Sequence, residues 1–317
     1  MLKTEVNKNP QQTTYFQRWR HFAAVTDVRN CFASNKQLED AKATVISYRS
    51  GQLPPDYSEE KYLQAKQLYD SAYHPDTGEK MPLIGRMSFQ VPAGMTMLGL
   101  LLQFYKTPVQ VASIQFVNQS FISFVNYTNR NAASHTTTKQ SLFAYVSATT
   151  TALCVAVGLN IYTRKAPPIF ARWAPFAAIS SASAVNIPLT RQDELLNGVV
   201  IKTEDGKIVG KSKKCARKGI LQVFVSRMVM VAPGMTLIPI LMEHLNKKQW
   251  FRKMPFIHLP FQMICIGTWM LVMLPSSCAL FPQTASMLVS DLEPNVRESI
   301  ENKYGNSVQY VYFNKGL

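Results

Sequence analysis

"SLFAYVSATTTALCVAVGLNIY", residues Ser141 to Tyr162, is the stretch that decides the fold class. Its 22 consecutive residues include no acid and no base. A helix that crosses the hydrocarbon core of a bilayer needs about 20 mostly apolar residues. A surface helix of a soluble protein would show a polar face, and this stretch has none of that kind. It therefore predicts a transmembrane helix.

Further tracts without charged residues follow Arg86. In the longest, residues 254–290, His258 is the only titratable side chain apart from cysteines. The mean hydropathy of −0.05 would also allow a soluble helical protein, but the polar first quarter of the chain lowers that average. The fold class that we predict is all-α, a polytopic integral membrane protein. Its five expected spans are at about 89–105, 141–162, 170–190, 223–243 and 257–281.

Proline and glycine lie inside most of these predicted spans. These residues include Pro92, Gly94, Pro175, Pro188, Pro233, Gly234, Pro260 and Pro275. Membrane helices tolerate such residues when neighbouring helices or water satisfy the freed carbonyl groups. A single proline usually produces only a packing kink, whereas helices broken near the middle of the membrane mark the substrate site in many transporters. We expect broken helices around the site.

Residues 1–86 differ because charged residues are spread throughout them. Ser34 and Gln37 form the pattern of a capping box, and a second helix is predicted from about Ser58. No secretory signal precedes these helices, so targeting information is expected to be internal. We divide the chain into a soluble helical N-terminal region (1–86), a transmembrane helical domain (87–290) and a C-terminal tail (291–317).

The formal net charge of +15 is concentrated after the N-terminal region. Residues 1–86 carry 12 Lys and Arg against 10 Asp and Glu, while residues 87–317 carry 22 against 9. The bases lie between long uncharged tracts with no interleaved aromatic motif, which argues against a nucleic-acid binder. Basic loops that face anionic lipids, such as cardiolipin, explain the charge better. The segment 211–219 is one such basic cluster.

"NQSFISFVNYTNR", residues Asn118 to Arg130, places amides among aromatic and aliphatic side chains. On a helix, the amides and Arg130 fall within one arc of about 120°. Isolated amides in lipid are costly, so this face must meet water, protein or a ligand. It is either a helix along the membrane surface with its amides towards the headgroups, or the wall of a polar cavity. The amides of this face are Asn118, Gln119, Asn126 and Asn129, together with Gln115 one turn before the stretch.

Two arginines, Arg191 and Arg227, are expected at different depths in the membrane. Arg191, at the end of the third span, is typical of an arginine that reaches to the headgroups. Arg227 lies further inside the fourth span, where a charge faces protein or a water-filled cavity. Arg227 is therefore the best candidate for a functional cation.

Catalytic and metal-binding motifs are not recognisable. "HPDTGEK" could ligate a metal, but Pro75, Asp76 and Gly78 favour a turn after His74. The cysteines form no CxxC pair and the histidines are scattered. We therefore predict no enzyme, no metal and no cofactor.

Several motifs in order resemble the sideroflexins, also called the mitochondrial tricarboxylate-carrier family. They are "HPDTGEKMPLIGRMSFQVP", "NQSF", "VNYTNR", "AYVSATT", "NIPLTRQDEL", "RMVMVAPGM", "CALFPQ" and "VYFNKGL". The resemblance runs nearly end to end and implies a mitochondrial inner-membrane protein with its N-terminus in the matrix. It also implies transport of small neutral amino acids into mitochondria for one-carbon metabolism, serine above all, with alanine and cysteine as further candidates. The stretch before "NQSF" and Thr190 depart from the family pattern, which leaves the substrate within the family open.

We therefore predict a transporter of serine or a similar neutral amino acid that works by alternating access. Amides would contact the solute and an arginine its carboxylate. The candidate substrate residues are Asn118, Gln119, Asn126, Asn129, Asn186, Arg191 and Arg227, while Pro188, Pro233 and Gly234 have structural roles together with the His74 turn. The alternatives are a citrate carrier, which would need several cations, and a non-transporting assembly protein of respiratory complexes.

Overall fold

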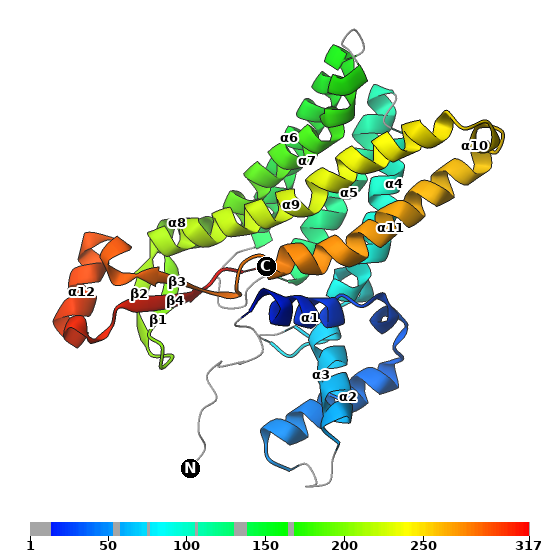
Figure 1. Cartoon of the computed structure of the whole chain (residues 1–317). Coiled ribbons are helices and arrows are strands. Elements are labelled where there is room, and N and C mark those ends of the chain that lie inside the picture. Colours follow the sequence, from blue (N-terminus) through cyan, green and yellow to red (C-terminus); the bar gives the residue numbers. More distant parts are fainter. Residues whose placement is uncertain are drawn as a thin grey trace.

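The computed structural model describes residues 14–52, 58–74, 77–104, 107–129, 138–163 and 168–316. The sequence interpretations of Pro75, Asp76 and Arg130, and of the Pro175 side chain, lie outside what is described. Helices dominate, and the apolar ones form an elongated bundle above a small helical region (Figure 1). The prediction of an all-α, polytopic membrane protein is confirmed.

The N-terminal region consists of α1 (Tyr15–Val25), α2 (Asn35–Arg49) and α3 (Glu59–Ala72), with a short 3-10 helix, η2 (Val28–Phe32). The predicted capping box is present: Ser34 Oγ accepts from the Gln37 amide at 3.3 Å, and Gln37 Oε1 accepts from the Ser34 amide at 2.8 Å. Helices α2 and α3 pack around Leu38, Val45 and Tyr69. Two further 3-10 turns, η3 (Leu83–Gly85) and η4 (Met87–Phe89), lead into the bundle.

The bundle contains α4 (Gln90–Gln103), α5 (Pro108–Thr128), α6 (Thr138–Thr163), α7 (Pro168–Thr190), α9 (Lys213–Asn246) and α11 (Pro255–Ala279). Within the described residues, three of them, α6, α9 and α11, are long and apolar enough to cross a membrane. Phe176–Thr190 within α7 is a shorter apolar helix. Helix α4 has 14 residues and rises about 21 Å, which is less than the expected first span. The short α8 (Gln192–Asn197) leads from α7 into the first strand, and α10 (Gln249–Arg252) joins α9 to α11.

Small side chains let α6 and α7 approach closely, and this is the most extensive helix pair in the molecule. Every fourth residue on the facing sides is a buried alanine. The positions are Ala144, Ala148, Ala152 and Ala156 on α6, and Ala174, Ala178 and Ala182 on α7. Because lipid is as apolar as these helices, close packing of small residues is what holds such pairs together.

Helices α4 and α11 pack through methionine side chains that lie directly against glycines of the partner helix. Met270 of α11 lies against Gly94 of α4, and in return Met95 Sδ would be 2.8 Å from a Cβ added to Gly267. The flexible thioether fills an irregular notch that a branched side chain would not. Each helix therefore supplies both a notch and a side chain to fill it.

The expectation of broken helices is wrong for α9 and α11. Helix α9 runs unbroken through Pro233 and Gly234, and α11 runs through its own two internal prolines. Trp269 supports the α9 proline region: its Nε1 lies 3.4 Å from the Met230 carbonyl, and its ring would be 2.9 Å from a Cβ on Gly234. Because α11 packs tightly against this part of α9, Pro233 and Gly234 do not interrupt α9.

The fourth span begins earlier than predicted, at Lys213 rather than near residue 223. The basic segment 211–219, expected to be a loop, forms the end of a strand and the first turns of α9. Ser212 Oγ caps the helix by accepting from the Cys215 amide at 3.1 Å, and the Glu293 carboxylate accepts from the Lys214 amide at 2.7 Å. The carboxylate offsets the positive charges at the positive end of the helix dipole.

A four-stranded antiparallel sheet, not predicted from the sequence, lies at one end of α9 (Figure 1). Its strands are β1 (Val199–Lys202), β2 (Ile208–Ser212), β3 (Thr284–Leu288) and β4 (Tyr310–Asn314), in the order β2-β1-β4-β3. The sheet packs with η5 (Val289–Asp291) and α12 (Pro294–Tyr304), which η6 (Gly305–Ser307) follows. Ile201, Ile300 and Val311 are fully or almost fully buried in its core. Part of the expected tail is thus a central strand.

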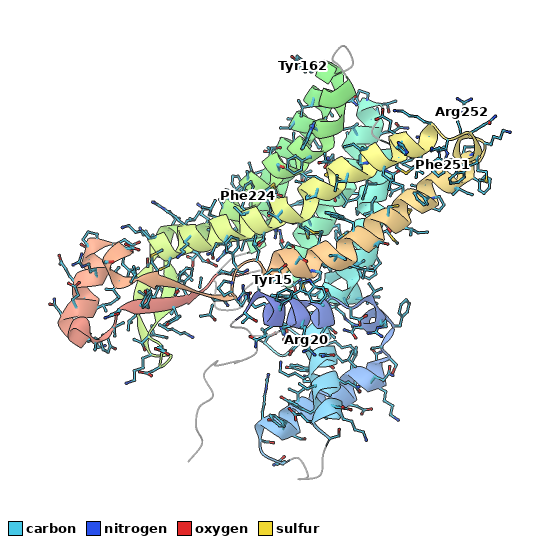
Figure 2. The ribbon with its side chains drawn as sticks, viewed as in Figure 1. Tyr15, Arg20, Tyr162, Phe224, Phe251 and Arg252 are labelled. Carbon is cyan, nitrogen blue, oxygen red and sulfur yellow. The ribbon has the colours of Figure 1, made fainter. Side chains whose placement is uncertain are left out.

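Aromatic side chains mark the end of the bundle away from the N-terminal region. Tyr162 and Arg252 lie in the upper part of Figure 2, whereas Tyr15 and Arg20 of α1 lie near its middle, below the long apolar helices. Tyr162 and Trp250 are strongly exposed there. Such aromatic residues are typical of the boundary between lipid and water.

Candidate functional site

Three predicted site residues meet inside the bundle. Arg227 Nη2 of α9 donates to Asn126 Oδ1 of α5 at 2.8 Å. Asn126 Nδ2 in turn donates to Asn186 Oδ1 of α7 at 3.1 Å. We call these residues the relay. Asn186 is buried, while Arg227 and Asn126 are partly buried, so the relay ties three helices together in the interior.

Local sequence patterns place these side chains. Asn186 follows Ala178 and Ala182 at four-residue spacing, so it continues the inward stripe of α7. Asn126 belongs to the amide face of α5, where Asn118 is also buried, whereas Phe116 and Phe124 on the apolar face are exposed. The amide face is therefore turned towards protein, as the cavity-wall interpretation requires, and not towards the headgroups.

Arg227 is a charge without a counter-charge. Within the described residues its side-chain hydrogen bond is to Asn126, and no Asp or Glu pairs with it. A cation inside a membrane helix faces protein or water and requires compensation. A guanidinium has five N–H donors in a fork that fits a carboxylate or phosphate. The relay therefore offers a binding point for an anionic group.

A cavity of about 120 Å³ lies between α4, α5, α7, α9 and α11. Its α9 residues Met230, Val231 and Gly234 lie on the same helix face as Arg227, one to two turns further along. Most of the lining is apolar, but Asn118 and Gln90 contribute amides. The side-chain nitrogens of both amides have no hydrogen-bond partner within the described chain. Because one water needs only about 10–15 Å³, a small solute fits this space.

The family follows from comparison with known proteins. The sequence model of the family "Sideroflexins" matches residues 7–317. This chain is a sideroflexin. It is 50% identical to sideroflexin-2 of Mus musculus over 306 residues, which covers 96% of this chain and 95% of that protein. It is 48% identical to sideroflexin-2 of Drosophila melanogaster over 311 residues, and 45% identical to sideroflexin-1 of Homo sapiens over 306 residues, with the same coverage. No solved structure matches the chain.

Two predicted site residues of this sideroflexin lie apart from the relay. Asn129 Nδ2 donates to the Gly85 carbonyl at 2.8 Å and so fastens the end of α5 to η3. Arg191 forms an ion pair with Glu194, and its Nη1 donates to the Lys315 carbonyl at 2.6 Å. Arg191 is thus neutralised within the protein rather than extended to the headgroups.

The described part of the "HPDTGEK" motif is a turn. The Gly78 amide donates to the His74 carbonyl at 2.9 Å, and Gly78 has a φ of 66°. His74 Nδ1 accepts from the Thr77 amide at 3.3 Å. Among the residues placed by the structure, no group of three or more His, Cys, Asp or Glu could hold a metal ion.

Sequence reasoning missed Lys315 in the C-terminal "NKGL" motif of this sideroflexin. Lys315 is 3% exposed, and its Nζ donates to the Phe281 carbonyl at 2.9 Å, just past the end of α11. Arg18 of α1 donates to the Ala279 carbonyl at 2.9 Å. Two cations thus occupy the negative end of the α11 dipole. Burial lowers the pKa of Lys315 to about 8.

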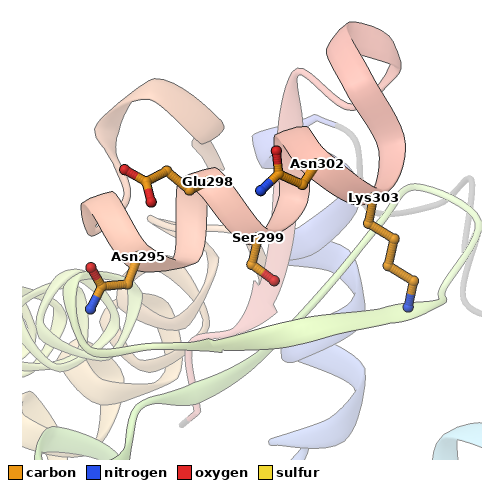
Figure 3. Close-up of a pocket in the computed structure, with 5 residues that line it drawn as sticks. All are labelled: Asn295, Glu298, Ser299, Asn302 and Lys303. Atoms are coloured by element: carbon orange, nitrogen blue, oxygen red, sulfur yellow. The ribbon is translucent and has the colours of Figure 1, made fainter.

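A second hollow of about 550 Å³ lies against the outer face of α12 (Figure 3). Its lining side chains are all exposed, and all belong to that one helix. They are Asn295, Glu298, Ser299, Asn302 and Lys303. Without a buried polar group this hollow is an open surface depression of the sideroflexin, and the relay with its cavity is the better candidate site.

Proposed function

We propose that this sideroflexin is a transporter of small neutral amino acids, serine in the first place, across the mitochondrial inner membrane. Alanine and cysteine are further candidates, and the transported serine would supply one-carbon metabolism. One observation carries the proposal: among the described residues Arg227 has no counter-charge, and it lies beside a cavity whose two amide nitrogens have no partner there. A zwitterion brings both the missing carboxylate and the acceptor oxygens that such donors need.

Binding would rearrange the relay. The solute carboxylate pairs with Arg227 and competes with Asn126 Oδ1, which now accepts from Arg227 at 2.8 Å. Loss of that bond releases α5 from α9. Because α9 is unbroken from Lys213 to Asn246, alternating access would proceed by movement of whole helices rather than by a hinge within α9.

A tricarboxylate fits these charges less well. Citrate needs several cations, and Arg227 is the one cation of the relay in the described structure. Arg191 is paired with Glu194, and Lys315 caps α11. The geometry therefore favours a solute with one carboxylate.

The test is uptake of labelled serine, alanine and citrate by purified protein in liposomes. We expect Arg227→Ala to lower serine uptake about 10- to 100-fold, since a hydrogen bond to a charged group contributes about 1.5–3 kcal/mol. Arg217→Ala, which removes an exposed arginine of the same helix, is the control and should transport normally. Thermal unfolding confirms that each variant is folded.

Normal serine uptake by Arg227→Ala would remove Arg227 from the site. Citrate uptake that competes with serine would favour the tricarboxylate alternative. Absence of flux for every solute, together with stable co-purification of respiratory subunits, would replace transport by an assembly role.

A further inference from the structure

Two further buried amides of α5 lie outside the lining of the cavity. Gln115 and Gln119 lie one turn apart and are 0% and 2% exposed. Among the described residues, neither polar atom of the Gln115 side chain has a hydrogen-bond partner, and Gln119 Nε2 has none. Thr149 of α6 is 6% exposed, and its Oγ1 also has no partner there.

The register of the helices brings these residues to one level. Ser120 of α5 and Tyr145 of α6 share a hydrogen bond of 2.8 Å between their hydroxyls. Towards the other end, Val111 of α5 packs with Ala156 of α6. Between these two contacts the antiparallel helices align Gln115 and Gln119 with Thr149.

Buried polar atoms without partners are rare in native proteins, so a group of them in one place indicates an absent partner. That partner must be small, must both donate and accept hydrogen bonds, and must tolerate a site without charge. Water and the neutral polar groups of a small solute meet these requirements. Apolar ligands and ions do not.

The unpartnered amides of α5 form a row along the helix with Asn126 of the relay. Gln115, Gln119 and Asn126 fall within an arc of about 40° on α5. The row therefore begins at the relay and continues towards the N-terminal end of α5. Residues 107–129 contain no acid or base, so a solute that leaves Arg227 meets no further charge of α5 on this face.

We infer that Gln115, Gln119 and Thr149 form a hydrated file between α5 and α6, along which the solute passes to and from the relay. The Met-lined cavity is then a chamber beside the relay, and the file is the route to it. The identity of the solute rests on the proposed function, whereas the presence of water in the file does not.

Cysteine accessibility tests the file. Thr149→Cys replaces a buried residue of α6, and Val146→Cys, 52% exposed on the outer face of α6, is the matched lipid-facing control. Only the thiolate reacts with a charged methanethiosulfonate, and a thiol in lipid stays protonated. In liposomes, after subtraction of labelling at the native cysteines in the unsubstituted protein, we expect Thr149→Cys to react on the order of tenfold faster. Equal or slower labelling would overturn the inference.

Uptake measurements separate the file from the binding point. We expect Gln115→Leu to lower serine uptake about tenfold while serine still protects the protein against thermal unfolding. Phe116→Leu, 50% exposed on the outer face of α5, is the control and should transport normally. A Gln115→Leu variant that is more stable and transports normally would show that the amides are only structural. Fast labelling of Thr149→Cys without transport by any variant would refute the proposed function and leave the hydrated file standing.

Discussion

Arg227 shows what one residue imposes on its surroundings. A guanidinium among apolar helices requires polar partners, and the structure supplies Asn126 and Asn186. All three were predicted from the sequence, because a charge deep in a span, an amide face and an amide near the end of an uncharged tract are local patterns. Their mutual contact was not predictable, since α5, α7 and α9 meet only in the folded bundle.

Asn126→Asp would supply the missing counter-charge. We expect the new carboxylate to pair with Arg227 and to lower serine uptake about 100-fold, because the solute carboxylate must then compete with a built-in one. Thermal stability should be unchanged or higher. Asn126→Ser, which adds no charge, is the control, and proteoliposome uptake is the measurement. An aspartate variant that transports as well as the serine variant would contradict this role of Arg227.

At the scale of elements, the start of α9 depends on a residue distant in sequence. The Glu293 carboxylate accepts from the Lys214 amide at 2.7 Å and from Ser212 Oγ at 2.8 Å. Burial alone would raise the pKa of Glu293, but these and further backbone hydrogen bonds lower it below its ordinary value. The carboxylate thus stabilises the fold above its unfolded pKa, and this contribution is lost as the pH falls through its lower folded pKa.

Glu293→Gln should therefore destabilise the protein at neutral pH by about 1 kcal/mol, as the loss of a helix cap usually does. The difference from the unsubstituted protein should shrink as the pH falls through the acid range. Thermal unfolding in detergent between neutral pH and about pH 4 measures it. Glu298→Gln, on the exposed face of α12, should have no such effect. Equal stability of the two variants would rule out the cap.

The elements that the sequence predicted are those with a local signal. Helices α6, α7 and α11 were predicted from uncharged tracts, and α5 was predicted from the amides on one face. The sheet was missed because its strands have only four or five residues and pair across long separations, as Lys202 does with Tyr312. The expectation of broken helices was wrong because the sequence around Pro233 and Gly234 does not reveal that Trp269 packs against this part of α9.

At the scale of the whole molecule, Lys315 joins parts that are far apart in the chain. It contacts the end of α11 through its ammonium and Arg191 through its carbonyl, while Arg18 of α1 bonds the same helix end. No sequence pattern singles out one lysine near a C-terminus, so its role emerged only from the fold.

Deprotonation of Lys315 should make the free energy of unfolding increase with pH. Burial lowers its pKa from the ordinary 10.5 to about 8, so the unfolded chain binds the proton more tightly than the fold between these values. The free energy of unfolding, measured relative to Lys315→Met, should therefore increase from about pH 8 towards pH 10.5. Thermal unfolding of both proteins across this range is the measurement. If the difference in the free energy of unfolding between the two proteins stayed constant or fell with pH, the lowered pKa of Lys315 would be contradicted.

The methionines seated on glycines between α4 and α11 have a consequence under oxidative stress. Conversion of Met95 or Met270 to the sulfoxide adds a polar oxygen where Gly267 and Gly94 leave no spare room. Peroxide would thereby wedge the two helices apart without touching the relay, and a reductase that repairs methionine would restore the fit.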